Sequence, residues 1–264
     1  MLSPPRLSRR ASEIKSSDLV LCHTGPVGKR QDSRDRTERR IVELGRRHLV
    51  TEGAAGLSLR AIARDLGMVS SAVYRYVGSR DELLTLLLVD AYTDLADAVE
   101  HARDAAPDSW REQLLAMGRA ARSWAVREPA SWTLLYGSPV PGYHAPREQT
   151  VAPGTRVVGA LFGVVATGVA NGEVPSSETG AKTAASKSTV PPSLSSDFDR
   201  LRAEFDFAVD DTVVAKCLVL WATLVGAISL EVFGQYGSDT FTDNAVVFDT
   251  QLSLVVEMLA GQNA

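Results

Sequence analysis

Apolar residues recur every three or four positions along most of the chain after residue 34, which is the spacing of one face of an α-helix. The first run ends at Gly53, and a second run begins after Ser58 and ends at Gly67. Serine before such a run and glycine after it favour the start and the end of a helix. The apolar positions are Ile41, Leu44 and Leu49 in the first run and Leu59, Ile62, Ala63 and Leu66 in the second. The pattern therefore predicts two helices, the second only about two turns long.

A third segment, 70–77, places Val73 and Val77 on one face and Tyr74 and Arg75 on the other. The four residues 79–82 then form a capping box, in which the serine accepts a backbone hydrogen bond and the glutamate reaches back. This box predicts a long helix that continues to about residue 103.

The rest of the chain alternates helical patterns with breakers. Ser109 and Glu112 form a second capping box, and its helix must end before Pro129. Further helices are expected over 152–170, 211–236 and 242–260, with a loop over 137–150. Residues 1–33 and 171–196 are rich in Pro, Ser, Thr and Gly and carry no period, which predicts a disordered basic N-terminal extension and a flexible insertion. No segment has a convincing strand pattern, so the fold class is all-α.

Charge is divided unevenly along the chain. Residues 1–80 hold 16 Lys and Arg against 8 Asp and Glu, whereas the remaining residues hold 12 against 24. Most of the basic surplus lies in residues 30–80, with 11 basic against 6 acidic side chains. This asymmetry predicts a basic module that binds a polyanion, attached to an acidic soluble body. A DNA-packaging protein would instead carry basic residues along its whole length.

Several classes of protein are disfavoured by composition. The two cysteines, Cys22 and Cys217, are far apart, which argues against a disulfide framework and a cysteine zinc site and fits the cytoplasm. The longest uncharged apolar runs, 157–172 and 217–230, are shorter than the roughly 18 residues of a membrane span, so no membrane association is expected. His48, His101 and His144 are isolated, and no phosphate loop or metal motif occurs. We therefore expect neither an enzyme nor a cofactor.

The two short helices around Gly67 suggest a helix-turn-helix. A glycine in a turn of three or four residues lets two helices cross steeply, and the second helix then protrudes. A major groove about 12 Å wide accepts one helix. The alternative is an ordinary αα-corner, which is common in helical proteins.

The stretch 36–84 resembles the N-terminal domain of the tetracycline-repressor (TetR) family. The resemblance rests on LSLRAIA at 57–63, Gly67, AVYRYV at 72–77 and SRDELL at 79–84. It implies a three-helix DNA-binding domain over residues 34–80 and a helical effector-binding and dimerisation domain over residues 81–264. The implied partners are double-stranded DNA with a palindromic operator, a second copy of the chain and a small-molecule effector.

The resemblance also implies roles for individual residues. Phosphate contacts are expected from Ser58, Arg60, Tyr74, Tyr76 and Arg80, and contacts to phosphate or the adjacent minor groove from Arg36, Arg39 and Arg40. Reading of base edges is expected from Ser70, Ser71, Ala72 and Arg75, where Arg75 can bind guanine with two hydrogen bonds. The sequence departs from the family pattern at Val69, where a capping serine is frequent, so we place the helix cap at Ser70. Val77 and Gly78 replace a common aromatic-proline pair.

The C-terminal part resembles the family more loosely. Residues 221–236 are similar to a subgroup with a Trp-His-Gly signature, but Val225 replaces the histidine. The resemblance implies that the last two helices pair with their copies in a four-helix bundle; the alternative is that they bury each other within one chain. The expected interface residues are Val214, Leu218, Trp221, Val225, Phe248, Leu252, Val255 and Leu259.

Aromatic residues cluster in the body, and two interpretations are open: part of the core, or the wall of an apolar effector pocket. The pocket candidates are Trp124, Trp132, Tyr136, Phe162 and Trp221. The function expected from all these features is a transcriptional regulator, a repressor released from a palindromic operator by a small, mainly apolar effector. The alternatives are a constitutive or architectural DNA-binding protein without an effector and, far behind, an enzyme that uses the helical body.

Overall fold

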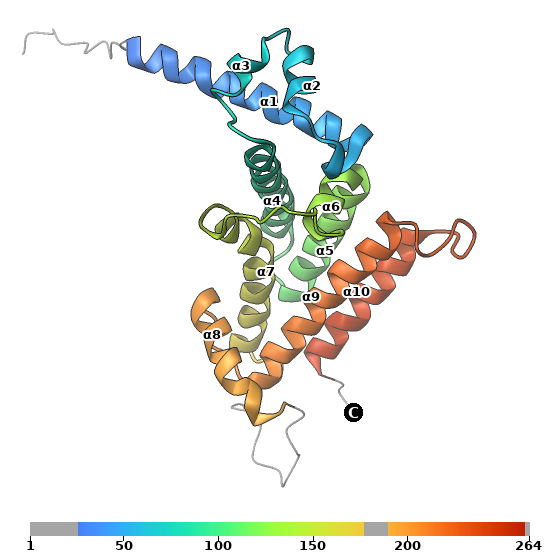
Figure 1. Cartoon of the computed structure of the whole chain (residues 1–264). Helices are drawn as coiled ribbons and strands as arrows, with labels where there is room; N and C mark the ends of the chain where they lie inside the picture. The colour runs from blue at the N-terminus through green and yellow to red at the C-terminus, as the bar shows by residue number, and fades with distance from the viewer. Residues whose placement is uncertain (1–25, 177–189, 262–264) are drawn as a thin grey trace, which may run out of the picture.

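The computed structural model describes residues 26–176 and 190–261, and within these ranges it contains ten α-helices, one 3₁₀ helix and no strand. A small tier formed by the first three helices sits on a larger helical body, and helix α4 runs from one into the other (Figure 1). The all-α prediction is confirmed.

The small tier consists of α1 (Pro26–Gly56), α2 (Leu59–Asp65) and α3 (Ser70–Val73). Its core contains Ile41, Ile62 and Val73, each fully buried. The α1 helix begins at Pro26, so the prediction of disorder is wrong for residues 26–33; residues 1–25 lie outside the described part of the chain. Pairs four residues apart, such as Arg34 with Glu38 at 2.8 Å, stabilise this polar part of the helix although it has no apolar face to bury.

Helix α4 (Arg80–Ala105) belongs to both cores. Its first two turns contribute Leu83, Leu84 and Leu87 to the core of the small tier. Its later turns contribute Leu95 and Val99 to the core of the body. A displacement of α4 therefore affects the core of the small tier and the core of the body together, because closely packed cores transmit strain.

The body adds α5 (Trp110–Arg127), α6 (Pro129–Tyr136), α7 (Arg147–Ala170), η1 (Pro192–Leu194), α8 (Ser195–Phe205), α9 (Asp211–Val232) and α10 (Asn244–Ala260). Helices α4, α5 and α7 form its centre, and α9 and α10 lie side by side against α5 (Figure 1). By length and composition alone, α7 and α9 could also cross a membrane, contrary to the expectation from the uncharged runs. In this fold both helices contribute to the core of the body, through Phe162 and Leu220 among others.

Local details of the body differ from the sequence predictions. Helix α6 was not predicted; it begins with Pro129 in its first turn, where the missing N–H breaks no helical bond. Helix α7 begins at Arg147 rather than at residue 152, and Pro153 lies inside it. Ser109 precedes α5 as predicted, but its side chain makes no capping hydrogen bond.

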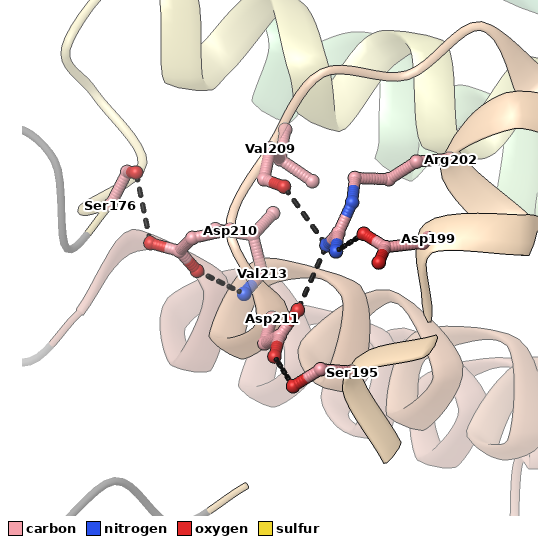
Figure 2. Close-up of polar contacts among 8 residues, drawn as sticks. All are labelled: Ser176, Ser195, Asp199, Arg202, Val209, Asp210, Asp211 and Val213. Carbon is pink, nitrogen blue, oxygen red and sulfur yellow. Dashed lines mark hydrogen bonds and ion pairs between the residues drawn. The ribbon is translucent and has the colours of Figure 1, made fainter. Parts of the chain in front are cut away.

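Both ends of the segment predicted as a flexible insertion, 171–196, are fixed to the body, and residues 177–189 lie outside the described ranges. The side chains of Val174 and Val190 are buried, and η1 and α8 begin before residue 196. The start of α9 holds both ends: the Ser176 hydroxyl donates to Asp210 at 2.9 Å, and the Ser195 hydroxyl donates to Asp211 at 2.7 Å (Figure 2). The flexible-insertion prediction is therefore wrong for these flanks.

The Asp211 carboxylate also joins α8 to α9. It accepts a second hydrogen bond at 2.9 Å from Arg202, whose guanidinium reaches Asp199 and the carbonyl of Val209 as well (Figure 2). The Ser195 hydroxyl and, after it, Arg202 lower the pKa of Asp211 below its usual value. These contacts stabilise the charged form of Asp211, since both donors bind the carboxylate.

The buried thiol of Cys217 provides a test of the packing around α9. Burial raises its pKa to about 12, with a small opposing effect from Lys216. Because the thiolate is the nucleophile, a Cys22→Ser variant should not react with Ellman's reagent at pH 8 while folded and should react fully in denaturant. Rapid reaction of the folded variant would contradict the burial of the Cys217 thiol.

Candidate nucleic-acid interface

The turn between α2 and α3 has the geometry of a helix-turn-helix. The Ser58 hydroxyl accepts a hydrogen bond from the Ala61 N–H at 3.4 Å and caps α2, as predicted. At the other end Gly67 adopts a φ of 65°, and the N–H groups of Gly67 and Met68 donate to the carbonyls of Arg64 and Ala63. This pair of bonds forms a Schellman motif. Its residue with positive φ, here Gly67, is usually glycine.

The α3 helix begins at Ser70, but its cap is Val69, whose side chain makes no hydrogen bond. The predicted cap at Ser70 is therefore wrong. Only residues 70–73 are α-helical, and hydrogen-bonded turns continue the segment to Val77. Val73 and Val77 are fully buried, as their spacing predicted.

The outer face of this segment carries the side chains predicted to contact DNA. Ser71, Tyr74 and Arg75 are exposed, and Ser70, Ala72 and Tyr76 are half-buried. Arg60, on α2, is exposed as well. The surface thus offers hydroxyl groups and guanidinium groups, which suit phosphate oxygens and base edges.

Helix α1 adds a row of basic side chains beside this surface. Arg36, Arg39 and Arg40 are exposed. The guanidinium of Arg34 lies 5.8 Å from the ring centre of Tyr76. The N-terminal part of α1 therefore lies next to the end of residues 70–77, the recognition segment. The His48 ring nitrogen Nε2 is 2.6 Å from the Asp65 carboxylate and joins α1 to the end of α2.

Arg80 is half-buried. Its guanidinium donates to the carbonyls of Ala54 and Ala55 at 2.7 and 3.2 Å and lies 3.7 Å from Asp81. These bonds satisfy carbonyls at the C-terminus of α1, where a positive charge is favourable. Both bonds come from one terminal nitrogen, Nη2, so a contact from Arg80 to phosphate would use the other guanidinium nitrogens, an arrangement that sequence reasoning did not foresee.

A polar bridge connects the small tier to the body. Arg46, on α1, forms an ion pair with Asp90 on α4 and lies 3.6 Å from Asp94. The indole of Trp124, on α5, donates to the same Asp94 at 3.1 Å. The hydrogen bond to Asp90 raises the pKa of Arg46, which keeps the bridge charged.

The five residues predicted to line a pocket do not all lie together. The rings of Trp132 and Tyr136 are 4.4 Å apart, and Trp221 meets Tyr136 at 6.0 Å, so three of the five gather. Phe162 instead packs against Phe205 and Phe207, and Trp124 is the buried partner of Asp94.

Two more tyrosines extend the Trp132–Tyr136–Trp221 cluster toward α4. Burial and then the neighbouring Tyr92 raise the pKa of Tyr136, while burial and then Tyr143 raise the pKa of Tyr92. The Tyr143 hydroxyl is 2.9 Å from the Thr85 hydroxyl. Sequence reasoning missed Tyr92, although its spacing with Leu88 and Leu95 placed it on the inner face of α4.

The predicted subunit interface needs correction. Val214, Phe248, Leu252, Val255 and Leu259 are buried in the core of their own chain, so the structure contradicts their assignment. Leu252, for example, faces α5, where a Cβ added at Gly118 would lie 2.5 Å from it. Leu218 is exposed, and Trp221 and Val225 are half-buried.

A different apolar surface lies on the outside of α9 and α10. The exposed side chains are Leu218, Val219 and Leu230 on α9, Phe233 at the C-cap of α9, and Val246 and Leu254 on α10. Between the two helices, the Gln251 side chain has a buried carbonyl oxygen that accepts no hydrogen bond from the described residues. A buried amide oxygen without a donor is costly.

The chain matches family models along most of its length. Residues 41–87 match the model described as bacterial regulatory proteins of the tetR family, and residues 114–255 match a tetracyclin repressor-like C-terminal domain. The assignment to the Trp-His-Gly subgroup stays a prediction.

Individual relatives agree with these matches. The chain is 60% identical over 241 residues to the HTH-type transcriptional regulator Rv1816 of Mycobacterium tuberculosis, a match that covers 91% of this chain and 99% of the relative. It is 33% identical over 124 residues to the HTH-type transcriptional repressor DrrR1 of Streptomyces coeruleorubidus, covering 47% and 44%. The crystal structure of regulatory protein SCO4313 superimposes with a TM-score of 0.68 at 28% identity, covering 86% of this chain and 98% of that one. The chain therefore belongs to the TetR family of helix-turn-helix transcriptional regulators and is not an enzyme.

Proposed function

We propose that the protein is a cytoplasmic, homodimeric repressor that binds a palindromic operator and is released by a small, mainly apolar effector. The observation that carries the proposal is helix α4, because it completes the core of the DNA-binding domain and also passes through the core of the body. A change in the body then has a direct mechanical route to the recognition segment. The partial similarity to a protein described as a repressor supports the sign of regulation.

The recognition segment divides the DNA contacts between specificity and affinity. Ser71 and Arg75 read base edges from the exposed start and outer face of the segment, while Tyr74 and Arg60 bind phosphate. Arg36 and Arg40, on the projecting part of α1, add contacts that depend strongly on salt. Arg80 binds the DNA backbone through the guanidinium nitrogens that do not hold the α1 carbonyls.

The apolar surface on α9 and α10 forms the subunit interface. Ala222 and Gly226 are exposed between the larger side chains and allow helices to approach closely. A partner at this surface also accounts for the apolar character of α9 without a membrane. A twofold dimer presents two recognition segments to half-sites about 34–36 Å apart, as a palindromic operator requires.

The effector binds beside the Trp132–Tyr136–Trp221 cluster. The rings are apolar, and the Tyr136 and Tyr92 hydroxyls add a few polar groups, which matches the usual composition of a ligand site. Binding favours an arrangement of α4 in which the bridge from Arg46 to Asp90 carries the DNA-binding domain out of register with the grooves. The effector needs only a higher affinity for that arrangement than for the operator-bound one.

A gel-shift titration tests the proposal on DNA from around the protein's own gene at about 150 mM salt. We expect binding at least about 10³-fold tighter than to random DNA of the same length. Equal affinity for both duplexes would contradict a sequence-specific regulator. Specific binding that no apolar compound weakens would instead support a constitutive DNA-binding protein.

Replacing Arg75 separates base reading from phosphate binding. Arg75→Ala should relax the preference at one base pair of each half-site, at a cost of about 1–3 kcal/mol, because the bidentate contact is lost. Tyr74→Phe is the matched control and should weaken specific and random DNA by similar factors. Unchanged base preference in Arg75→Ala, measured by competition among operator variants, would refute the assignment.

A further inference from the structure

Val69 has an exposure that nothing within the fold explains. Its side chain is 71% exposed, the highest fraction among the exposed large apolar residues of the described chain. It immediately precedes α3, and its neighbours Ser71, Tyr74 and Arg75 are polar and exposed. An isopropyl group therefore projects from the polar surface that faces DNA in the proposed function.

The valine does not serve the stability of the helix it precedes. The backbone at Val69 is extended, with φ −69° and ψ 141°, the conformation that a capping serine or threonine adopts. The side chain cannot accept the hydrogen bond that such a cap would accept, and it is not buried. Any benefit of the isopropyl group must come from outside the chain.

The chemistry of the major groove supplies one apolar feature for it. Residues at the start of a recognition helix contact base edges. Among these edges the only apolar group is the C5-methyl of thymine, which apolar side chains contact. We propose that Val69 reads a thymine in each operator half-site by packing against its methyl group, an inference that rests on the proposed function.

The methyl contact makes a prediction that hydrogen bonding does not. Uracil keeps every hydrogen-bonding group of thymine and lacks only the methyl. An operator selected from random duplexes with the unaltered protein should contain a thymine whose replacement by uracil weakens binding about fourfold in one half-site, as expected for one buried methyl group. Replacement in both half-sites should weaken binding roughly fifteenfold, because separated positions contribute additively.

The Val69→Ala variant should bind the thymine and uracil operators with affinities that agree within about twofold, since its shorter side chain no longer reaches the methyl group. Val50→Ala is the matched control: Val50 is 69% exposed but lies on α1 near Pro129 of α6, away from the recognition segment. It should retain the full uracil effect. Circular dichroism checks that both variants are folded.

Two results would overturn the assignment of Val69. One is a selected operator in which no thymine-to-uracil replacement weakens binding, and the other is an undiminished uracil effect in Val69→Ala. Failure of the proposed function would look different, because the unaltered protein would then select no operator from random duplexes at all.

Discussion

Leu254→Glu is expected to convert the protein to a monomer and to lower its affinity for the operator on the order of 10³-fold. Leu254 is 65% exposed on α10, within the apolar surface proposed as the subunit interface. A carboxylate there would have to be buried against the partner without a counter-charge. The free-energy cost of that burial should exceed the favourable free energy of association. A monomer holds one half-site only, so its binding falls toward the unspecific level.

Light scattering after size exclusion gives the oligomeric state, and a gel shift gives the affinity. Val126→Glu is a matched control, because Val126 is 47% exposed on α5, outside the proposed interface. It should leave both the dimer and operator binding unchanged. A Leu254→Glu protein that still elutes as a dimer would place the interface elsewhere.

Arg122→Ala is expected to lower the free energy of unfolding by about 3–5 kcal/mol, because it leaves a buried carboxylate without its partner. Two hydrogen bonds, of 2.7 and 2.5 Å, join the Arg122 guanidinium to Glu231 across α5 and α9. The side chains are only 20% and 11% exposed. Urea unfolding at equal protomer concentration measures the loss, because the stability of a dimer depends on concentration.

Two further variants separate the lost pair from the lost side chain. Arg119, one turn earlier on α5, pairs with Asp249 at 3.0 Å, but the two side chains are 51% and 42% exposed. Arg119→Ala should therefore cost less than about 1 kcal/mol. Arg122→Met combined with Glu231→Leu should recover most of the stability, since neither charge remains. Equal losses for Arg119→Ala and Arg122→Ala would show that burial does not set the cost.

Several features fixed by hydrogen bonds between near neighbours could be predicted from the sequence, although the capping hydrogen bonds expected from Ser70 and Ser109 were not found. Ser58 and Ser79 cap the helices that they were expected to cap, and Gly67 has the left-handed conformation that ends α2. In the capping box, the Glu82 carboxylate was expected to accept from the backbone N–H of Ser79. It accepts instead from the N–H of Gly78, one residue earlier. Such features depend on a few consecutive residues, so a short motif contains most of the information.

Features that depend on distant residues could not be predicted in the same way. The stripe from Phe248 to Leu259 was identified correctly as apolar, but periodicity does not state which neighbour covers it, and here that neighbour is the chain itself. Arg80 lies in a recognisable motif, yet its guanidinium is held by carbonyls more than twenty residues away. Val69 was noticed only as a missing cap, because its exposure emerges from the arrangement of α2 and α3.

Sharing of α4 between two cores has a thermodynamic consequence. A DNA-binding domain cut after Arg80 would lack Leu83, Leu84 and Leu87, so it does not carry a complete core of its own. The two domains should then melt together as one cooperative unit. An effector that binds the folded body raises the melting temperature of the helix-turn-helix as well, by mass action. Release from DNA thus requires no unfolding of the recognition segment: the inducer removes the protein from its operator while protecting the fold that will bind it again.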